Sequence, residues 1–203
     1  SEFCNNYFNF DVVDDYIDLG KDNYENITFE TVLDGNTGKI KTILYNMSNG
    51  GYQLRLSNSA NSITFNYKNT ATVSRSLPTS FSKVIDKVYY AVTYDGEKIK
   101  TYVNGILVKT SSSKIYFADN DSSLLIGAGR NGTDLQNFYS GKIFTTRIYN
   151  RALTENEIEK NYLVDKNRYD FSNRGLTSSS TTATSDSGVD AYKAFDSDTN
   201  TSC

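Results

Sequence analysis

The chain has 203 residues, with 21 basic and 24 acidic side chains, a net charge of -3 and no histidine, and this length suffices for one all-β domain with a substantial core and part of a second. Because no cluster of lysines and arginines could neutralise a row of phosphates, and no apolar run approaches the roughly 20 residues that span a bilayer, we expect neither nucleic-acid binding nor membrane insertion. The lack of histidine removes the usual proton carrier at neutral pH and the commonest transition-metal ligand, which weighs against an enzyme.

Short runs of β-branched and aromatic residues, separated by Gly, Asn and Ser, predict strands along most of the chain. The clearest group is residues 88–110, where the tight-turn dipeptides Asp95-Gly96 and Asn104-Gly105 mark a three-stranded meander. Further strands are predicted in NYFNF, DYIDLG, NITFETVL, KTILYNM, GYQLRL, SITFNY, ATVSRSL, SLLIGAG and FYSGKIFTTRIY. In the last of these neither alternating set of side chains is purely apolar, so we expect both faces to be covered. Pro78 is expected in a loop, where its missing N–H breaks no ladder.

One helix is predicted after the last of these strands. Thr154 stands three residues before Glu157, which is the spacing of a capping box, and Leu153 and Ile158 are spaced for a hydrophobic staple. Because a polar run follows at residues 165–168, the helix is expected to have about two turns. Many short strands and one helix favour an antiparallel two-sheet β-sandwich, since each sheet must hide one face against the other.

Three stretches resemble, in order, the concanavalin A-like lectin and laminin G superfamily in its bacterial and phage-type laminin G-like branch. They are FNFDVVDDYIDLG, YYAVTYDGEKIKTYVNGILV and GKIFTTRIYNRALTENEI, and they fall within residues 5–165. Each stretch alone is a weak signal, whereas their combination is specific. The resemblance implies a jelly-roll β-sandwich in which the last strand pairs near the first and the short helix packs on the outside as a closing element.

The end of the chain, from the Ser/Thr-rich run after Leu176, has the composition of a linker. It also resembles the opening of a discoidin-type domain (coagulation factor 5/8 type C, or carbohydrate-binding family 32), with Ser197 in place of the usual Gly and Cys203 in place of the usual Trp. Such a domain needs roughly 130 residues. We therefore expect a sandwich domain at residues 1–168, and a linker with a truncated discoidin-like start at residues 169–203.

These likenesses imply a piece of a longer modular protein that is extracellular, on a cell surface or attached to a virion, with neighbouring domains of the same polypeptide among its partners. The two cysteines, Cys4 and Cys203, lie at opposite ends of the chain. Sequence leaves open whether they are free thiols or join the termini, because pairing requires the two ends to meet in space.

Calcium is the one cofactor that the resemblance implies. Family members often carry an acidic calcium ligand directly after the Gly-x-Ile of the last strand, but here that position is Phe144, which offers no oxygen to a hard cation. The usual calcium site is therefore not expected. The sequence leaves open a variant calcium site with other ligands. The candidate ligands are the group Asp11, Asp14 and Asp15, and the alternating pair Asp196 and Asp198. The alternative is that these acids are solvated turn residues.

Catalysis is not expected. The ExDxxE strand of glycoside hydrolases with this fold is absent, and the alternate glutamates 155, 157 and 159 would point around a helix rather than into one groove.

The loop at residues 130–139 is the best candidate binding site, because it combines a cation, amides, a carboxylate and an aromatic ring. The candidate residues are Arg130, Asn131, Asp134, Gln136 and Tyr139. The prediction is a non-catalytic module that binds a carbohydrate or a cell surface, with a glycan or a surface protein as its partner. The alternative is a protein-interaction or spacer module of an adhesin or a phage tail fibre.

Overall fold

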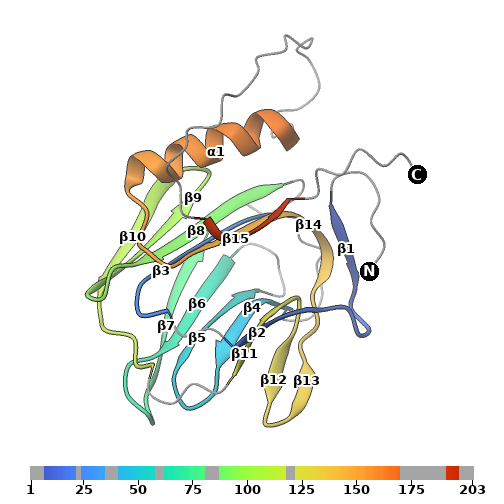
Figure 1. Cartoon of the computed structure of the whole chain (residues 1–203), viewed down its shortest axis with the longest axis vertical. Coiled ribbons are helices and arrows are strands. Elements are labelled where there is room, and N and C mark those ends of the chain that lie inside the picture. Colours follow the sequence, from blue (N-terminus) through green and yellow to red (C-terminus); the bar gives the residue numbers. More distant parts are fainter. Residues whose placement is uncertain are drawn as a thin grey trace.

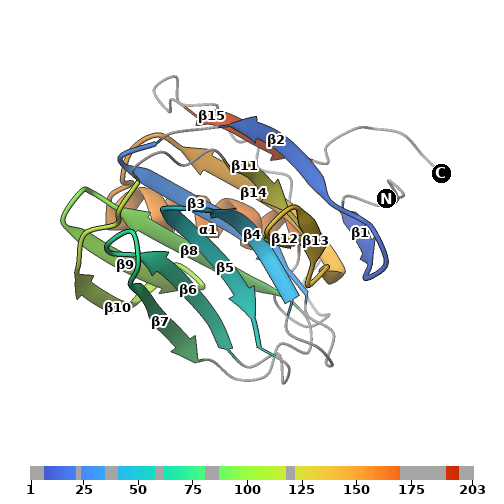
Figure 2. The same cartoon turned by 90° about the horizontal axis from the view of Figure 1, so that it is seen from below.

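The computed structural model describes residues 7–21, 24–34, 41–57, 62–80, 87–117 and 122–169, and the backbone of residues 191–196. Two antiparallel sheets stack face to face, and one helix lies across the outer face of one of them (Figures 1 and 2). The predicted class, an all-β jelly-roll sandwich with one helix near the C-terminal end, is confirmed.

The helix-bearing sheet has seven strands. In spatial order these are β1 (Phe8–Asp11), β14 (Ser140–Tyr149), β3 (Ile27–Leu33), β8 (Val88–Tyr94), β9 (Lys98–Val103) and β10 (Ile106–Ser112), and β15 (Ala191–Asp196) also pairs with β14. The other sheet has six strands, in the order β2 (Ile17–Lys21), β11 (Ser123–Ile126), β4 (Lys41–Met47), β5 (Gly51–Leu56), β6 (Ser62–Lys68) and β7 (Ser74–Ser80). A short hairpin of β12 (Gly129–Asn131) and β13 (Asp134–Gln136) completes the strands.

Alternation along the six-stranded sheet separates an apolar inner face from a polar outer face. In β5 and β6 every second side chain is buried in the core, and these are Tyr52, Leu54, Leu56, Ile63, Phe65 and Tyr67. The residues between them, such as Gln53, Arg55 and Asn66, face outward and are half-buried. Since burying a large apolar side chain stabilises by roughly 1.5–3 kcal/mol, this alternation determines which face of the sheet meets the core.

β14 is covered on both faces, as its pattern predicted. Ile143 and Ile148 belong to the main core, while Phe144 and Tyr149 belong to a second cluster beneath the helix. A bulge between Ile143 and Thr145 interrupts the register with β3. On the opposite edge β14 pairs with β1, with Phe8 opposite Ile143. The last strand of the sandwich therefore pairs with the first, which confirms the expectation from the resemblance.

The helix α1 (Glu155–Tyr169) begins as predicted but is longer. The backbone N–H of Thr154 donates to Glu157 Oε2 (2.8 Å), and the N–H of Glu157 donates to Thr154 Oγ1 (3.3 Å), which forms the capping box. The helix has 15 residues, about four turns instead of two. The predicted end was wrong because Asp165, read as part of a solvated polar run, is fully buried against the sheet.

Pro78 lies in a strand, which corrects the expected loop. It stands opposite Thr64 in β7, the edge strand of the six-stranded sheet. An edge strand needs ladder hydrogen bonds on one side alone, so proline is tolerated there.

After residue 169 the structure describes β15 alone, whose backbone pairs antiparallel with β14, with Ala194 opposite Arg147. The discoidin-like start and the boundary at residue 168 stay predictions. Cys4, Cys203 and Asp198 lie outside the described residues, and the side chain of Asp196 is not described. In the described part of the chain no helix is long and apolar enough to cross a membrane.

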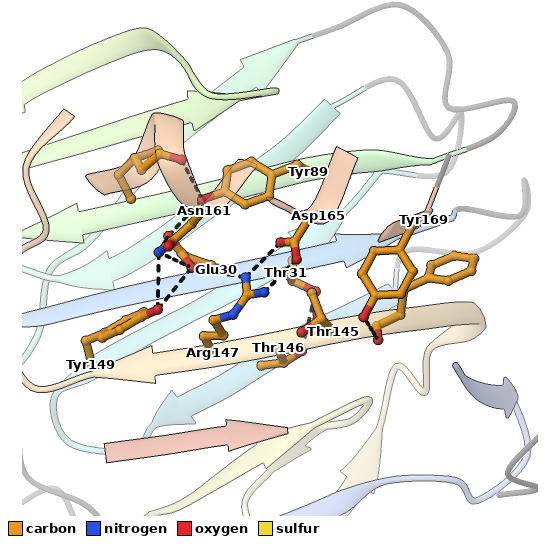
Figure 3. A network of polar contacts seen from close by, with 12 residues as sticks. Glu30, Thr31, Tyr89, Thr145, Thr146, Arg147, Tyr149, Asn161, Asp165 and Tyr169 are labelled. Carbon is orange, nitrogen blue, oxygen red and sulfur yellow. Dashed lines mark hydrogen bonds and ion pairs between the residues drawn. The ribbon is translucent and has the colours of Figure 1, made fainter. Parts of the chain in front are cut away.

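A buried polar network joins α1 to the sheet beneath it (Figure 3). Arg147 of β14 binds Asp165 of α1 through two hydrogen bonds, Nη1 to Oδ2 at 2.7 Å and Nη2 to Oδ1 at 2.5 Å. Glu30 of β3 is 0% exposed and accepts hydrogen bonds from the Tyr89 hydroxyl (2.7 Å) and from Asn161 Nδ2 (3.0 Å). The Arg147 guanidinium lies 3.4 Å from Glu30. One cation thus bridges two buried carboxylates.

Burial raises the pKa of Glu30 above its usual value, although Arg147 and the donors Asn161 and Tyr89 favour the charged form. The network serves to hold the helix rather than to expose reactive groups, because its carboxylates lie between α1 and the sheet.

Substituting Asp165 by Ala should lower the free energy of unfolding by about 3–5 kcal/mol, because Arg147 loses its closest carboxylate while remaining largely buried. Urea denaturation measures the effect. Glu159→Ala, on the exposed side of the same helix, is the matched control and should change the free energy by less than about 0.5 kcal/mol. Equal effects of the two substitutions would show that the ion pair does not anchor the helix.

The start of the helix should lose stability in acid. The Arg151 guanidinium, with smaller help from the N–H and hydroxyl of Thr154, lowers the pKa of Glu157 from 4.5 to about 2. A depressed pKa contributes stability that is fully present above about pH 4.5 and is lost as the pH falls towards 2. Glu157→Gln keeps a capping side chain but cannot titrate. The difference in unfolding free energy between wild type and Glu157→Gln should therefore be greatest above pH 4.5 and should shrink towards pH 2 in urea denaturation. A difference that is constant over this range would contradict the assignment.

Candidate functional site

The β12–β13 hairpin stands against the end of β4. Gly132 and Thr133 form the turn between the paired residues Asn131 and Asp134, and Gly132 adopts a φ of 62°. The backbone N–H of Thr42 donates to the carbonyl of Asn137 just after the hairpin (2.8 Å). A Cβ on Gly129 would lie 2.9 Å from Thr42 Oγ1, so glycine is required for this close approach. Local turn chemistry forms the hairpin, and tertiary contact fixes it beside the six-stranded sheet.

An open groove of about 690 Å³ lies between this hairpin and the six-stranded sheet. We call it the hairpin groove. Its lining includes Tyr45 of β4, Lys68 of β6, Ser74 of β7, and Arg130 and Asn131 of the hairpin. Tyr45 stands in an outward-facing row with Gln53, Asn66 and Ser76 on the neighbouring strands. Segments far apart in the sequence thus meet in one polar depression.

Arg130 and Tyr45 are close neighbours in the groove. Burial raises the pKa of the Tyr45 hydroxyl, while the positive charge of Arg130 acts in the opposite direction. Arg130 Nη1 donates to the carbonyl of Thr133 (3.1 Å), which ties the guanidinium to the hairpin. The groove therefore combines an aromatic ring with a cation whose direction is set by the backbone.

The five residues predicted for the binding loop separate into three groups in the structure. Arg130 and Asn131 line the hairpin groove. Asp134 and Gln136 stabilise the hairpin instead: Asp134 Oδ1 accepts from Thr133 Oγ1 (3.4 Å), and Gln136 Nε2 donates to the carbonyl of Arg130 (3.3 Å). Tyr139 is 0% exposed, so its ring does not reach the surface for stacking.

The side chain of Tyr139 belongs to the main core. Its ring packs edge-on against Phe10, with centroids 5.8 Å apart, and its hydroxyl donates to the carbonyl of Asp34. The aromatic ring that lines the groove is that of Tyr45, which is 9% exposed and which sequence reasoning missed. Alternation in β4 would have suggested an outward Tyr45, but no local signal brings β4 next to residues 130–133.

The structure brings together the three acidic residues near the N-terminus. Oxygens of Asp11, Asp14 and Asp15 lie within 4.8 Å of one another. Asp11 Oδ1 accepts from the N–H of Val13 (2.8 Å), and Asp15 Oδ2 accepts from the N–H of Asp11 (3.0 Å). These are the contacts of turn residues.

The position where the family often carries an acidic ligand is apolar in its surroundings as well as in its side chain. Phe144 is 7% exposed and packs against Tyr7 and Tyr169, with ring centroids 5.6 and 5.5 Å away. Calcium takes six to eight oxygen ligands, so the residues at this position do not fit the usual calcium site.

We expect no saturable calcium binding at micromolar concentrations, because the three carboxylates of this turn fall short of the six to eight oxygen ligands that calcium takes. Isothermal titration calorimetry of the metal-free chain with calcium chloride measures this. A binding isotherm that disappears in the double variant Asp14→Asn and Asp15→Asn would overturn the expectation and establish a variant site at this turn.

The model of the concanavalin A-like lectin/glucanases superfamily matches residues 14–159. Among solved structures, the CBM40 module of the Ruminococcus gnavus IT-sialidase, bound to alpha2,3 sialyllactose, is similar at 15% identity, with a TM-score of 0.64 over 77% of this chain and 95% of that chain. The botulinum neurotoxin serotype D binding domain has 18% identity and a TM-score of 0.60, covering 81% of this chain and 44% of that chain. A SAP-like pentraxin of Limulus polyphemus has 11% identity and a TM-score of 0.55, covering 74% of this chain and 78% of that chain.

Curated protein sequences give no significant match. Identities this low show a shared fold alone, whereas the superfamily model spans most of the chain and both sheets of the sandwich. The chain belongs to the concanavalin A-like lectin/glucanases superfamily.

Proposed function

We propose that the chain is a non-catalytic recognition module that binds a carbohydrate of a cell or particle surface in the hairpin groove. The observation that carries this proposal is the composition of the groove. It joins the ring of Tyr45 to the amide of Asn131 and to serine hydroxyls. Sugars have apolar ring faces that pack on aromatic rings, and hydroxyls that both donate and accept hydrogen bonds.

The similar structures support the proposal at the level of fold. One is a carbohydrate-binding module bound to sialyllactose, and another is the binding domain of botulinum neurotoxin DC in complex with SialylT. This fold therefore accommodates saccharide ligands in other proteins, although the fold by itself assigns no ligand to this chain.

The positions of the carboxylates favour binding over catalysis. Glycoside hydrolysis by the common mechanisms needs two carboxyl groups on either side of the scissile bond. In the described part of the chain no Asp or Glu lines the hairpin groove. The buried carboxylates of Glu30 on β3 and Asp165 on α1 lie instead between the helix and the other sheet.

A protein-interaction or spacer module is the second candidate, and an exposed apolar edge favours it. Ile106, Leu107 and Val108 of β10 are 69%, 36% and 46% exposed. β10 is the edge strand of the seven-stranded sheet, and such an edge can accept a strand or an apolar surface of another protein.

A glycan array probed with the isolated chain should give hits, and Asn131→Ala should weaken binding of a hit roughly threefold to tenfold, the effect of one lost neutral hydrogen bond. Asp134→Asn is the matched control, because Asp134 lies on the same hairpin without lining the groove. Calorimetry on the strongest hit quantifies both variants.

If the chain binds no glycan on the array, this result contradicts carbohydrate binding and favours the spacer module. Turnover of a glycan that one carboxylate-to-amide substitution abolishes would contradict the non-catalytic assignment.

A further inference from the structure

We infer that the hairpin groove takes an acidic saccharide, one that carries a carboxylate or a sulfate group, through Lys68 and Arg130. This inference rests on the proposed carbohydrate-binding function and adds the chemical class of the ligand.

The charges that line the hairpin groove have one sign. Lys68 and Arg130 are its charged lining residues, and no acidic residue of the described chain joins them there. The whole chain, in contrast, has a net charge of -3. A depression that is positive on an otherwise acidic protein attracts anions locally and orients them as they approach.

In the part of the chain that the structure describes, neither Lys68 nor Arg130 forms an ion pair with a carboxylate, whereas Lys100, Arg147 and Arg151 do. The guanidinium of Arg130 instead donates to the Thr133 carbonyl at 3.1 Å. Asp134 is the carboxylate of the hairpin, and it lies outside the groove lining, where it accepts from the hydroxyl of Thr133. The positive charge of Arg130 and Lys68 is therefore available to a ligand.

The geometry suits a saccharide with an anionic substituent. One N–H of Arg130 binds the Thr133 carbonyl and orients the plane of the guanidinium, which leaves its other donors for a carboxylate or sulfate. Lys68 lies on β6, two strands from the β4 strand that carries Tyr45, a separation of about 10 Å at the usual strand spacing. A sugar on the Tyr45 side of the groove would thus lie between two cations.

A third cation faces outward on the same sheet. Arg55 of β5 stands between Thr42 and Thr64 in an outward row, and its Nε is buried with no hydrogen-bond partner among the described residues. Arg55 does not line the groove, but its charge adds to the positive potential of this face.

The test compares acidic glycans with their neutral parents, and the sulfated and unsulfated pair differs only in the acidic group. Calorimetry with sialyllactose against lactose, and with sulfated against unsulfated lactose, should show binding of at least one acidic member and weaker or no binding of its neutral counterpart. Lys68→Gln and Arg130→Gln should each weaken binding of the acidic glycan roughly tenfold to hundredfold, as expected for one charged hydrogen bond. Binding should also weaken as the salt concentration rises.

Lys160→Gln, on the exposed side of α1, makes the same change in net charge far from the groove and should leave affinity unchanged. Circular dichroism and melting temperatures establish that all variants are folded.

The outcomes distinguish this inference from the proposed function. If the neutral and acidic glycans bind equally, and Lys68→Gln and Arg130→Gln have no effect while Asn131→Ala weakens binding, the acidic class is wrong and carbohydrate binding by the groove stands. If Lys68→Gln, Arg130→Gln and Lys160→Gln weaken binding equally, the acidic glycan is attracted by the net charge of the chain, and the assignment of the ligand to the groove is wrong. If no glycan binds at all, the proposed function fails and this inference fails with it.

Discussion

The ion pair between Arg147 and Asp165 holds α1 against the seven-stranded sheet. Removing a guanidinium from water costs several kcal/mol unless a carboxylate with good geometry replaces the solvent, and Asp165 supplies two short hydrogen bonds. Arg147 belongs to β14, which also pairs with β3 and β1. The helix, the core strand β3 and the first strand are thereby joined through one strand.

This arrangement gives the two sheets different roles. The outer face of the seven-stranded sheet is occupied by α1, which covers Tyr89, Phe144 and the carboxylate of Glu30. The outer face of the six-stranded sheet is not covered by a helix in the described chain, and the β12–β13 hairpin forms one wall of a groove there. The polar network that holds the helix lies on one side of the molecule, and the polar hairpin groove lies on the other.

Much of the architecture could be predicted because it depends on neighbouring residues. Asn104 and Gly105 both adopt positive φ, 50° and 77°, so the sequence of this turn already specifies a tight hairpin. The spacing of Thr154 and Glu157 likewise places the start of the helix, since the capping bonds close within three residues.

By itself the sequence determined the fold class, most of the strand positions and the start of the helix, because periodicity, turns and caps are local interactions. Tertiary structure alone decided the length of the helix, since Asp165 reads as a solvated residue until Arg147 is placed against it. It also decided the candidate site. Tyr139 and Tyr45 are chemically identical and both largely buried, and only tertiary packing encloses Tyr139 completely while it leaves the 9% exposed Tyr45 at the groove.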